Sequence, residues 1–365
     1  MAQELVALNP GTRVSGRWTI VNQLGAGAFG AVYLCQDDQG TQAALKTEAI
    51  NTAHPLLVME ASVLSSLHVL RGAGDAQHFC SCLDIGRDQQ RDANTGRMTS
   101  FNFIAMSLVG RGLDGLLREA GDHFSPGTAI GLSIQLLAAI RTLHHVGFLH
   151  RDIKPANITI GRPEANEQRL LYLIDFGMAR KFLRPDGSQR RPRATTHFRG
   201  TPIYAPIAAH INSEYSRKDD VESWFYVLIK FYKGSVPWKH EQNVRQMGER
   251  KCRRLANQPV DVRSQARVEL IGGCPAEFDQ ILTHIDGLQL EDRPNYEMIV
   301  SLLRRCLANN GFHEHPYDWE VGRRNADQRQ ARSVGGNVQP RPGGGEGGRQ
   351  QGQVRSEGGN VRGHA

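Results

Sequence analysis

Four polar residues with fixed spacing, in His150-Arg151-Asp152-Ile-Lys154-Pro-Ala-Asn157, form the strongest chemical pattern in this sequence. A carboxylate at Asp152 can orient a hydroxyl group and accept its proton, and Lys154 can neutralise a phosphoryl group during its transfer. The amide oxygen of Asn157 suits Mg²⁺, which prefers oxygen ligands. Because the run fits H-R-D-x-x-x-x-N at every fixed position, phosphoryl transfer is a better interpretation than a chance polar loop.

A second carboxylate, Asp175, opens the tripeptide Asp175-Phe176-Gly177, directly after the apolar run 170–174. At the end of a strand this carboxylate is well placed for a metal ion that bridges two phosphates. The tripeptide alone is an ordinary turn. Its position in the chain, after a glycine-rich loop, a lysine, a glutamate and the H-R-D run, supports the metal-binding interpretation.

The glycine-rich loop spans residues 25–32 and reads Gly-Ala-Gly-Ala-Phe-Gly-Ala-Val, which matches G-x-G-x-x-G-x-V. Glycines allow a backbone to approach phosphate groups closely. An ordinary glycine-rich hairpin and a dinucleotide-binding turn remain alternatives for this motif alone. The next segment, 31–35, is typical of a strand and not of the helix that a Rossmann unit needs, which favours a phosphate loop between two strands.

Lys46 ends a short apolar run and follows Gly30 by sixteen residues. It can pair with the α- and β-phosphates of a nucleotide, although a single lysine is more often a surface residue. Fourteen residues further on, Glu60 lies in an apolar, helix-forming segment, where a carboxylate needs a partner. We predict that Lys46 is this partner. Glu48 is a rival carboxylate for Lys46, but it is too close in sequence to Lys46 to reach it from a helix. A solvent-facing Glu60 is the alternative.

The elements that position these residues change character along the chain. Strands are expected at residues 18–21, 31–35, 43–46 and 101–108, and helices at 56–70, from 126 to Gly147, and at 219–232, 275–285 and 296–307. Ser125 is the expected N-cap of the helix that begins with Pro126. A strand-rich first part and a larger helical part predict a two-lobed α+β fold.

Composition limits the remaining possibilities. No apolar run reaches the roughly 18 residues that span a bilayer, and no basic start precedes an apolar core, so we expect neither a membrane span nor secretion. The six cysteines are scattered. Cys80 and Cys82 alone are a weak metal signal, and reduced thiols in an intracellular protein are the better interpretation.

The net charge of +7 is concentrated near the C-terminus, where residues 321–365 carry eight arginines and three acids. This tail is rich in Gly, Gln, Arg and Asn and has almost no aliphatic residues, which predicts disorder. Weak, salt-sensitive binding to RNA or another polyanion is the alternative, without base stacking because the tail has no aromatic residues.

Taken together, these residues resemble the eukaryotic protein kinase superfamily over about residues 18–310. Finer features resemble the casein-kinase-1 group and, most closely, its tau-tubulin kinase branch. The stretches that carry this resemblance are 146–157, 174–180, 190–194 with 198–201, and 217–220 with Pro237 and Trp238. The resemblance implies a kinase domain at 18–312, with an N-lobe at about 18–106, a hinge at 107–110 and a C-lobe at 111–312, preceded by an extension at 1–17.

The resemblance also implies ATP and Mg²⁺ as cofactors. Met106 would be the gatekeeper, followed by a hinge at Ser107, Leu108 and Val109. The positions that would bind ATP are Leu24, Gly25, Ala26, Gly27, Ala28, Phe29, Gly30, Val32, Ala44, Lys46, Met106, Ser107 and Val109. The catalytic positions would be Asp152, Lys154, Lys46, Glu60 and Thr201, with Asn157 and Asp175 as metal ligands. Thr201 would lie beside Asp152 and Lys154, Lys154 would mark serine/threonine specificity, and Asp220 would brace the catalytic loop.

Three departures from the family pattern are present. Most kinases end the activation segment with Ala-Pro-Glu, whereas this chain has Ala205-Pro206-Ile207. The casein-kinase-1 group also lacks this acid, and its usual Ser-Ile-Asn is only partly matched by residues 206–208. An insertion at about 89–99 is expected to lengthen the loop before the hinge strand, away from the chemistry.

Seven basic residues and only two acids lie between Asp175 and Pro206. Arginine clusters favour phosphate and carboxylate groups, so we predict acidic or already phosphorylated protein substrates, bound by Arg191, Arg193 and Arg199. A solvated basic loop is the alternative. Thr195, Thr196 and Thr201 are candidate phosphorylation sites, although the resemblance implies activity without loop phosphorylation.

The expected function is a serine/threonine protein kinase that transfers the γ-phosphate of ATP. A pseudokinase scaffold would need a broken catalytic residue, and a small-molecule kinase of related fold is opposed by Lys154 and by the long segment through Thr201. We expect a monomer in the cytoplasm, with the nucleus as a second location, no membrane partner, and no nucleic-acid partner beyond weak contacts of the tail.

Overall fold

The computed structural model describes residues 5–27, 30–52, 55–70, 76–91, 96 and 98–321. Ala28 and Phe29 of the glycine-rich loop, and the tail from residue 322 onward, lie outside the described residues. Within the described ranges, no helix combines the length and the apolar character that crossing a bilayer requires.

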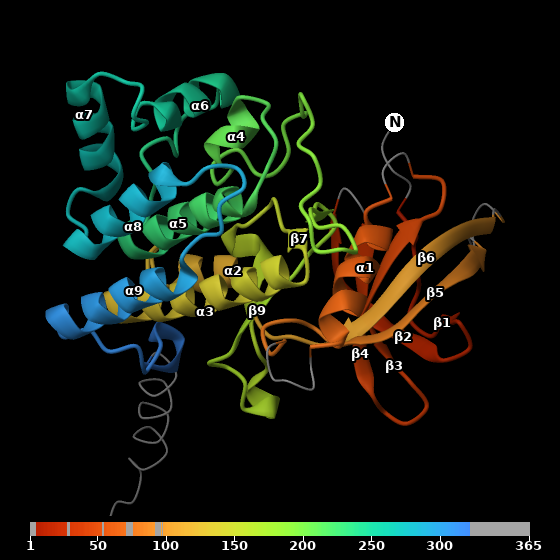
Figure 1. Cartoon of the computed structure of the whole chain (residues 1–365). Coiled ribbons are helices and arrows are strands. Elements are labelled where there is room, and N and C mark those ends of the chain that lie inside the picture. The colour runs from red at the N-terminus through yellow and green to blue at the C-terminus, as the bar shows by residue number, and fades with distance from the viewer. Residues whose placement is uncertain are drawn as a thin grey trace, which may run out of the picture. The chain divides into compact units, whose positions relative to one another are not determined.

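A six-stranded antiparallel sheet dominates the N-terminal part, with helix α1 packed against it (Figure 1). The strand order is β1-β2-β3-β4-β6-β5. The strands are β1 (Arg13–Val14), β2 (Trp18–Gly27), β3 (Gly30–Gln36), β4 (Gln42–Ala49), β5 (Cys82–Arg91) and β6 (Met98–Ser107), and α1 spans Leu57–His68. The strands and the helix that the sequence predicts are therefore present. Strands β3 and β4 are longer at both ends than the pattern indicated, and β2 is longer at its C-terminal end.

The expected lengthening of the loop at 89–99 was wrong for residues 89–91 and 98–99, which belong to strands β5 and β6. Gln89 pairs with Ser100, and Arg91 pairs with Met98, so these residues extend the β5–β6 ladder, whereas residues 92–95 and 97 lie outside the described residues. Polar side chains line this end of the hairpin, which hides it from a search for apolar alternation. Such side chains are compatible with an edge of a sheet that faces water, because the ladder still satisfies the backbone groups.

Residues before Trp18 belong to the core of the N-lobe. Val6, Leu8 and Val14 are buried together with Trp18. The hydroxyl of Tyr33 donates a hydrogen bond to the carbonyl oxygen of Val6 (2.6 Å) and accepts one from the amide of Leu8 (3.2 Å). The segment that the sequence analysis treats as an extension is thus packed onto the sheet by apolar burial.

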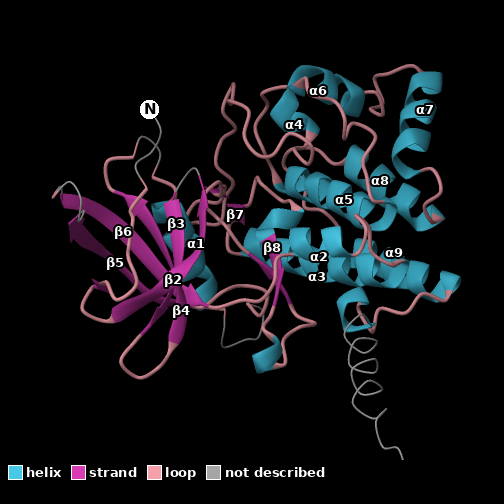
Figure 2. Cartoon of the chain, turned by 180° about the vertical axis from the view of Figure 1, so that it is seen from behind, coloured by secondary structure: helices cyan, strands magenta, loops and turns pink. Residues whose placement is uncertain are grey.

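The C-terminal part is mainly helical, and Figure 2 shows its helices beside the sheet. The helices are α2 (Leu113–Glu119), α3 (Pro126–His145), α4 (Ile207–His210), α5 (Arg217–Lys233), α6 (Val244–Cys252), α7 (Val260–Ile271), α8 (Ala276–Gly287) and α9 (Tyr296–Asn310). The four helices predicted after residue 125 correspond to α3, α5, α8 and α9. The mixed α+β class predicted from the sequence is confirmed.

Helix α5 lies at the centre of the C-lobe. Twelve of its residues are buried, and it packs along α3, where the indole nitrogen of Trp224 donates to the carbonyl oxygen of Ser133 (2.8 Å). Ser216 and Asp219 form a capping box at its start, and Gly234 ends it in the left-handed conformation. This helix is therefore fixed at both ends as well as along its sides.

The folded unit continues beyond residue 312, where the sequence analysis ends the kinase domain. Tyr317 is completely buried. Asp318 accepts hydrogen bonds from the amide and the hydroxyl of Ser125, at 2.7 and 2.6 Å, and so reinforces the predicted Ser125 cap of α3. Residues 313–321 thus complete the N-terminal end of that helix.

Candidate active site

Two short antiparallel pairs carry the loops of the site. Strand β7 (Phe148–Leu149) pairs with β10 (Arg180–Lys181), and β8 (Ile158–Ile160) pairs with β9 (Leu171–Leu173). The H-R-D run leaves β7, and the tripeptide 175–177 follows β9. Because the backbone amide of Ile174 donates to the carbonyl oxygen of Asn157 (3.0 Å), the two candidate metal-binding segments lie side by side.

The catalytic loop is held from below by Asp220, as the resemblance implied. The fully buried carboxylate accepts hydrogen bonds from the backbone amides of His150 (2.7 Å) and Arg151 (2.8 Å), and it contacts Nε2 of His144 (2.8 Å). Arg151 has a φ angle of 67°, a conformation that is costly for a residue with a side chain. The hydrogen bonds from α5 offset this strain.

Asp152, Lys154 and Thr201 form one polar cluster. The Lys154 ammonium lies 2.7 Å from a carboxylate oxygen of Asp152 and 3.0 Å from the hydroxyl of Thr201. The amide and hydroxyl of Thr201 donate to the other carboxylate oxygen of Asp152, at 2.9 and 2.8 Å. Asp152 is thereby fixed in orientation, as a group that positions an incoming hydroxyl must be.

Across from this cluster, the predicted ion pair of Lys46 and Glu60 is present at 2.6 Å. Lys46 also lies 3.0 Å from Asp175. Burial would lower the pKa of Lys46, but the two carboxylates outweigh it and raise that pKa above its ordinary value. Glu48 does not compete, because its carboxylate accepts the backbone amide of Leu56 (2.8 Å) at the start of α1.

These groups share a cavity of about 850 Å³ between the sheet and the helical part. All the predicted ATP-binding, catalytic and metal-binding residues that the structure describes line it: Leu24, Gly25, Ala26, Gly27, Gly30, Val32, Ala44, Lys46, Glu60, Met106, Ser107, Val109, Asp152, Lys154, Asn157, Asp175 and Thr201. Several other residues that line the cavity were not predicted, among them Cys80, Ala156 and Ile174. Ala156 and Ile174 adjoin motif residues and could have been inferred, whereas Cys80 has no local signal.

Asn157 and Asp175 fit a divalent metal ion. The Asn157 side-chain amide donates to the carbonyl oxygen of Asp152 (2.9 Å), which leaves its own oxygen as a possible ligand. Burial alone would raise the pKa of Asp175. The nearby charge and hydrogen bond of Lys46 outweigh burial, so the pKa of Asp175 lies below its ordinary value and the carboxylate is charged. No group of three His, Cys, Asp or Glu side chains suited to a metal occurs within the described residues. Phosphate oxygens of a nucleotide would add to the oxygen ligands that Mg²⁺ prefers.

The three arginines predicted to bind a substrate anion are in different situations. Arg193 is engaged by Glu214, which its Nε contacts at 3.0 Å and which also binds Arg180 at 2.5 Å. Arg191 and Arg199 have no acidic partner among the described residues. Burial is the main cause that lowers the pKa of Arg151 to about 10, and the nearby charges of Arg199, Arg180 and Arg193 lower it further.

Comparison with known proteins defines the class. The family model described as the protein kinase domain matches residues 18–310, and the chain therefore belongs to the protein kinase family. It is 35% identical over 314 residues to a protein of Dictyostelium discoideum described as a probable serine/threonine-protein kinase. The alignment covers 85% of this chain and 58% of that relative. The resemblance inferred from the motifs is thus confirmed at the level of the kinase family.

Proposed function

We propose that this chain is a serine/threonine protein kinase that transfers the γ-phosphate of ATP to hydroxyl groups of proteins. One observation carries the proposal: a single cavity is lined both by the group Lys46, Glu60 and Asp175 and by the cluster of Asp152, Lys154 and Thr201. The description of the Dictyostelium relative supports the same activity. Because no catalytic position of the motif set is substituted, a pseudokinase is disfavoured.

Each of these residues has a distinct part in the proposed reaction. Lys46, aimed by Glu60, binds the α- and β-phosphates, and Asn157 and Asp175 hold Mg²⁺. When bound, this metal would supply neutralisation of the charge on the phosphates. Asp152 orients the acceptor hydroxyl and takes its proton, while Lys154 stabilises the charge on the transferring group. Thr201 holds the side chains of Asp152 and Lys154 in position, since its hydroxyl contacts both of them.

Phosphorylation of casein with Mg-ATP tests this proposal. We expect Asp152→Asn to lower kcat by about 10³-fold while ATP binding persists, because only the orientation of the hydroxyl and the proton acceptor are removed. Lys46→Met should weaken ATP binding as well. Asp261→Asn, at an exposed carboxylate in the first turn of α7, is the matched control and should retain activity. Equal activity of Asp152→Asn and the wild type would contradict the proposal.

We also propose that the chain belongs to the casein-kinase-1 group, near its tau-tubulin kinase branch, and prefers acidic or phosphorylated substrates. The sequence Ala205-Pro206-Ile207 and the basic activation segment support this assignment. Since Arg193 is engaged by Glu214, the substrate anion would bind mainly to Arg191 and Arg199.

Paired peptides that differ only in flanking acidic, phosphorylated or basic residues test the substrate preference. Arg191→Gln with Arg199→Gln should raise KM for the acidic peptide several-fold and leave KM for a neutral peptide unchanged. Arg184→Gln, at an exposed arginine of the same segment, is the control. Equal rates of the wild type on basic and acidic peptides would refute the preference.

For the whole protein we propose a monomer in the cytoplasm and nucleus.

A further inference from the structure

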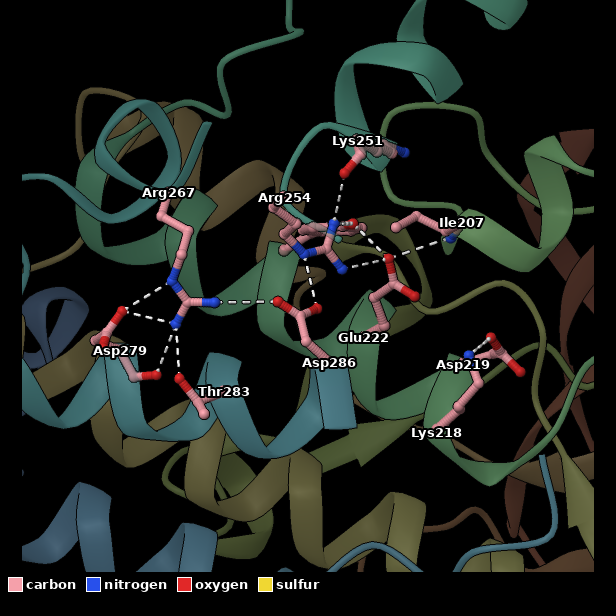
Figure 3. Close-up of polar contacts among 11 residues, drawn as sticks. Ile207, Lys218, Asp219, Glu222, Lys251, Arg254, Arg267, Asp279, Thr283 and Asp286 are labelled. Atoms are coloured by element: carbon pink, nitrogen blue, oxygen red, sulfur yellow. Dashed lines mark hydrogen bonds and ion pairs between the residues drawn. The ribbon is translucent and has the colours of Figure 1, made fainter. Parts of the chain in front are cut away.

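Three buried charged side chains surround the end of the activation segment. Glu222 lies on α5, Lys251 on α6, and Arg254 two residues after α6 ends, and all three are at most 4% exposed. Buried charges are costly unless each one is paired and hydrogen-bonded. Figure 3 shows the Glu222 carboxylate between Arg254 and the backbone amide of Ile207, and Arg254 bound to the backbone carbonyl of Lys251.

Glu222 supplies a carboxylate to the end of the activation segment, which has no acidic residue at position 207. Residue 207 is isoleucine, whereas an acid usually follows Ala-Pro in kinases. In this structure the carboxylate of Glu222 accepts a hydrogen bond from the backbone amide of Ile207 (3.1 Å). The same oxygen pairs with Arg254 at 2.8 Å and accepts the hydroxyl of Tyr226 at 2.5 Å. A carboxylate of α5 therefore binds the backbone of Ile207, the residue that stands where an acid is usual.

Lys251 binds the backbone of the residues that precede Ile207. Its Nζ donates hydrogen bonds to the carbonyl oxygens of Pro202 (2.8 Å) and Ala205 (2.7 Å), and it lies 5.0 Å from the ring centres of Tyr226 and Trp238. Burial and the charge of Arg254 lower the pKa of Lys251 to about 7, although Glu222 opposes this shift. Both the ammonium and the neutral amine have at least two N–H groups, so either form can hold both carbonyls.

The segment held by Glu222 and Lys251 directly follows Thr201, a member of the polar cluster with Asp152 and Lys154. The amides of Tyr204 and Ala205 both donate to the carbonyl oxygen of Thr201 at 2.9 Å, and the indole of Trp238 donates to Ile203 (2.8 Å). Residues 201–204 remain partly exposed, whereas 205–209 are buried. A protein whose hydroxyl lies at Asp152 would therefore contact residues 202–204 next.

We propose that Glu222 and Lys251 are positioning residues for the protein substrate, which fix segment 202–207 as the surface on which the chain around the acceptor hydroxyl lies. Glu222 takes the place of the carboxylate that this segment lacks. The inference rests on the proposed kinase activity. Neither residue lines the cavity, so their effect should fall on the protein substrate and not on ATP.

The test compares Glu222→Gln and Lys251→Met with Arg267→Gln. Arg267 belongs to the same polar network, since it contacts Asp286 (3.1 Å) and Asp279 (2.7 Å), but it has no contact with segment 202–207 (Figure 3). We expect Glu222→Gln and Lys251→Met to raise KM for a peptide substrate about tenfold while KM for ATP changes less than twofold. Arg267→Gln should lower the melting temperature and leave both KM values unchanged.

A rescue separates positioning from general stability. In the double variant Glu222→Gln with Ile207→Glu, the acid returns to the segment itself, near Arg254, and KM for the peptide should fall back toward the wild-type value. If Glu222→Gln and Lys251→Met change both KM values together, or if they lower only the melting temperature as the control does, the proposal is overturned.

Hydrogen exchange at residues 202–207 is a readout that does not need activity. The amides of this segment should exchange faster in Glu222→Gln and Lys251→Met than in the wild type, and unchanged in Arg267→Gln. A wild-type protein that transfers no phosphate yet shows this pattern would refute the kinase proposal alone. Active wild-type protein without the pattern would refute the positioning role alone.

Discussion

Individual glycines of the phosphate loop have different physical roles. Gly30 has a φ angle of 152°, and a Cβ atom there would collide with the carbonyl oxygen of Thr47 in β4. Around Gly25 and Gly27, a Cβ atom would meet none of the described residues within 4 Å. The third glycine is therefore required by strand packing, whereas the first two leave space on the cavity side.

Alanine substitutions should separate these roles. Gly30→Ala is expected to lower the free energy of unfolding by about 1–3 kcal/mol, because the backbone of β3 must move away from β4. Gly25→Ala and Gly27→Ala should change it by less than about 1 kcal/mol and raise KM for ATP. Denaturant unfolding and ATP titrations measure both effects. A fully stable Gly30→Ala protein would show that the packing argument is wrong.

Glu214 gives the activation segment a dependence on pH. Burial alone would raise the pKa of Glu214, but the hydrogen bonds of Arg193 and the charge of Arg180 lower it from 4.5 to about 2. Because this pKa is lower in the folded state than in the unfolded one, the stabilisation is fully present above about pH 4.5 and is lost as the pH falls toward 2. The shift corresponds to roughly 3 kcal/mol, and the exposure of Arg193 reduces the net value to about 1–2 kcal/mol.

Glu214→Gln tests this dependence directly. The variant should be less stable than the wild type by about 1–2 kcal/mol at pH 7, and the difference should shrink as the pH falls from 4.5 toward 2. Urea unfolding at several pH values measures it. Glu249→Gln, which breaks an exposed ion pair with Arg245 on α6, is the control and should change stability by less than about 1 kcal/mol. A difference that stays constant with pH would contradict the prediction.

The residues of the site could be predicted because their chemistry demands particular side chains at short, fixed spacings. Asp152 and Asn157 lie within one loop, and the apolar setting of Glu60 already demanded a cation such as Lys46. Residues such as Glu222 and Lys251 escaped this reasoning. Their partners come from segments far apart in sequence, so that only packing of α5 and α6 brings them together.

At the scale of elements, α5 controls the catalytic loop through one carboxylate. Asp220→Asn retains the shape of the side chain but loses its charge and one acceptor, so two backbone amides and His144 compete for a single oxygen. We expect kcat to fall at least about tenfold and the free energy of unfolding to fall by about 2–4 kcal/mol. Steady-state kinetics combined with thermal unfolding measures both. Unchanged kcat in a folded Asp220→Asn protein would refute this role.

Helices α4, α6 and α7, which the sequence did not predict, carry no readable apolar pattern. Only Leu270 is fully buried on α7, and the buried residues of α6 are Met247, Gly248 and Lys251. Neither segment has the apolar stripe from which a helix is read. Helix α4 has only four residues, too few for any period to be seen. By contrast, α3 and α9 each bury several apolar residues at helical spacing, and their sequence pattern was sufficient.

At the scale of the whole folded unit, the chain before Trp18 contributes to stability. Leu8 is 5% exposed, whereas Leu5, three residues earlier, is 46% exposed. Leu8→Ala should therefore lower the free energy of unfolding by about 2–4 kcal/mol, and the control Leu5→Ala by no more than about 0.5 kcal/mol. Denaturant unfolding distinguishes them. Equal effects would mean that the segment is not part of the core in solution.

The burial of α5 on almost every side has a kinetic meaning. Its amides are shielded by α3 on one side and by α8 on another, and the helix is closed by a capping box and a glycine. Local opening that leaves the rest of the fold intact cannot expose such a helix, so its amides should gain deuterium only through global unfolding. The slowest labels in the protein would then report its full stability, and the hydroxyl-orienting loop attached to that helix would keep its shape for as long as the fold survives.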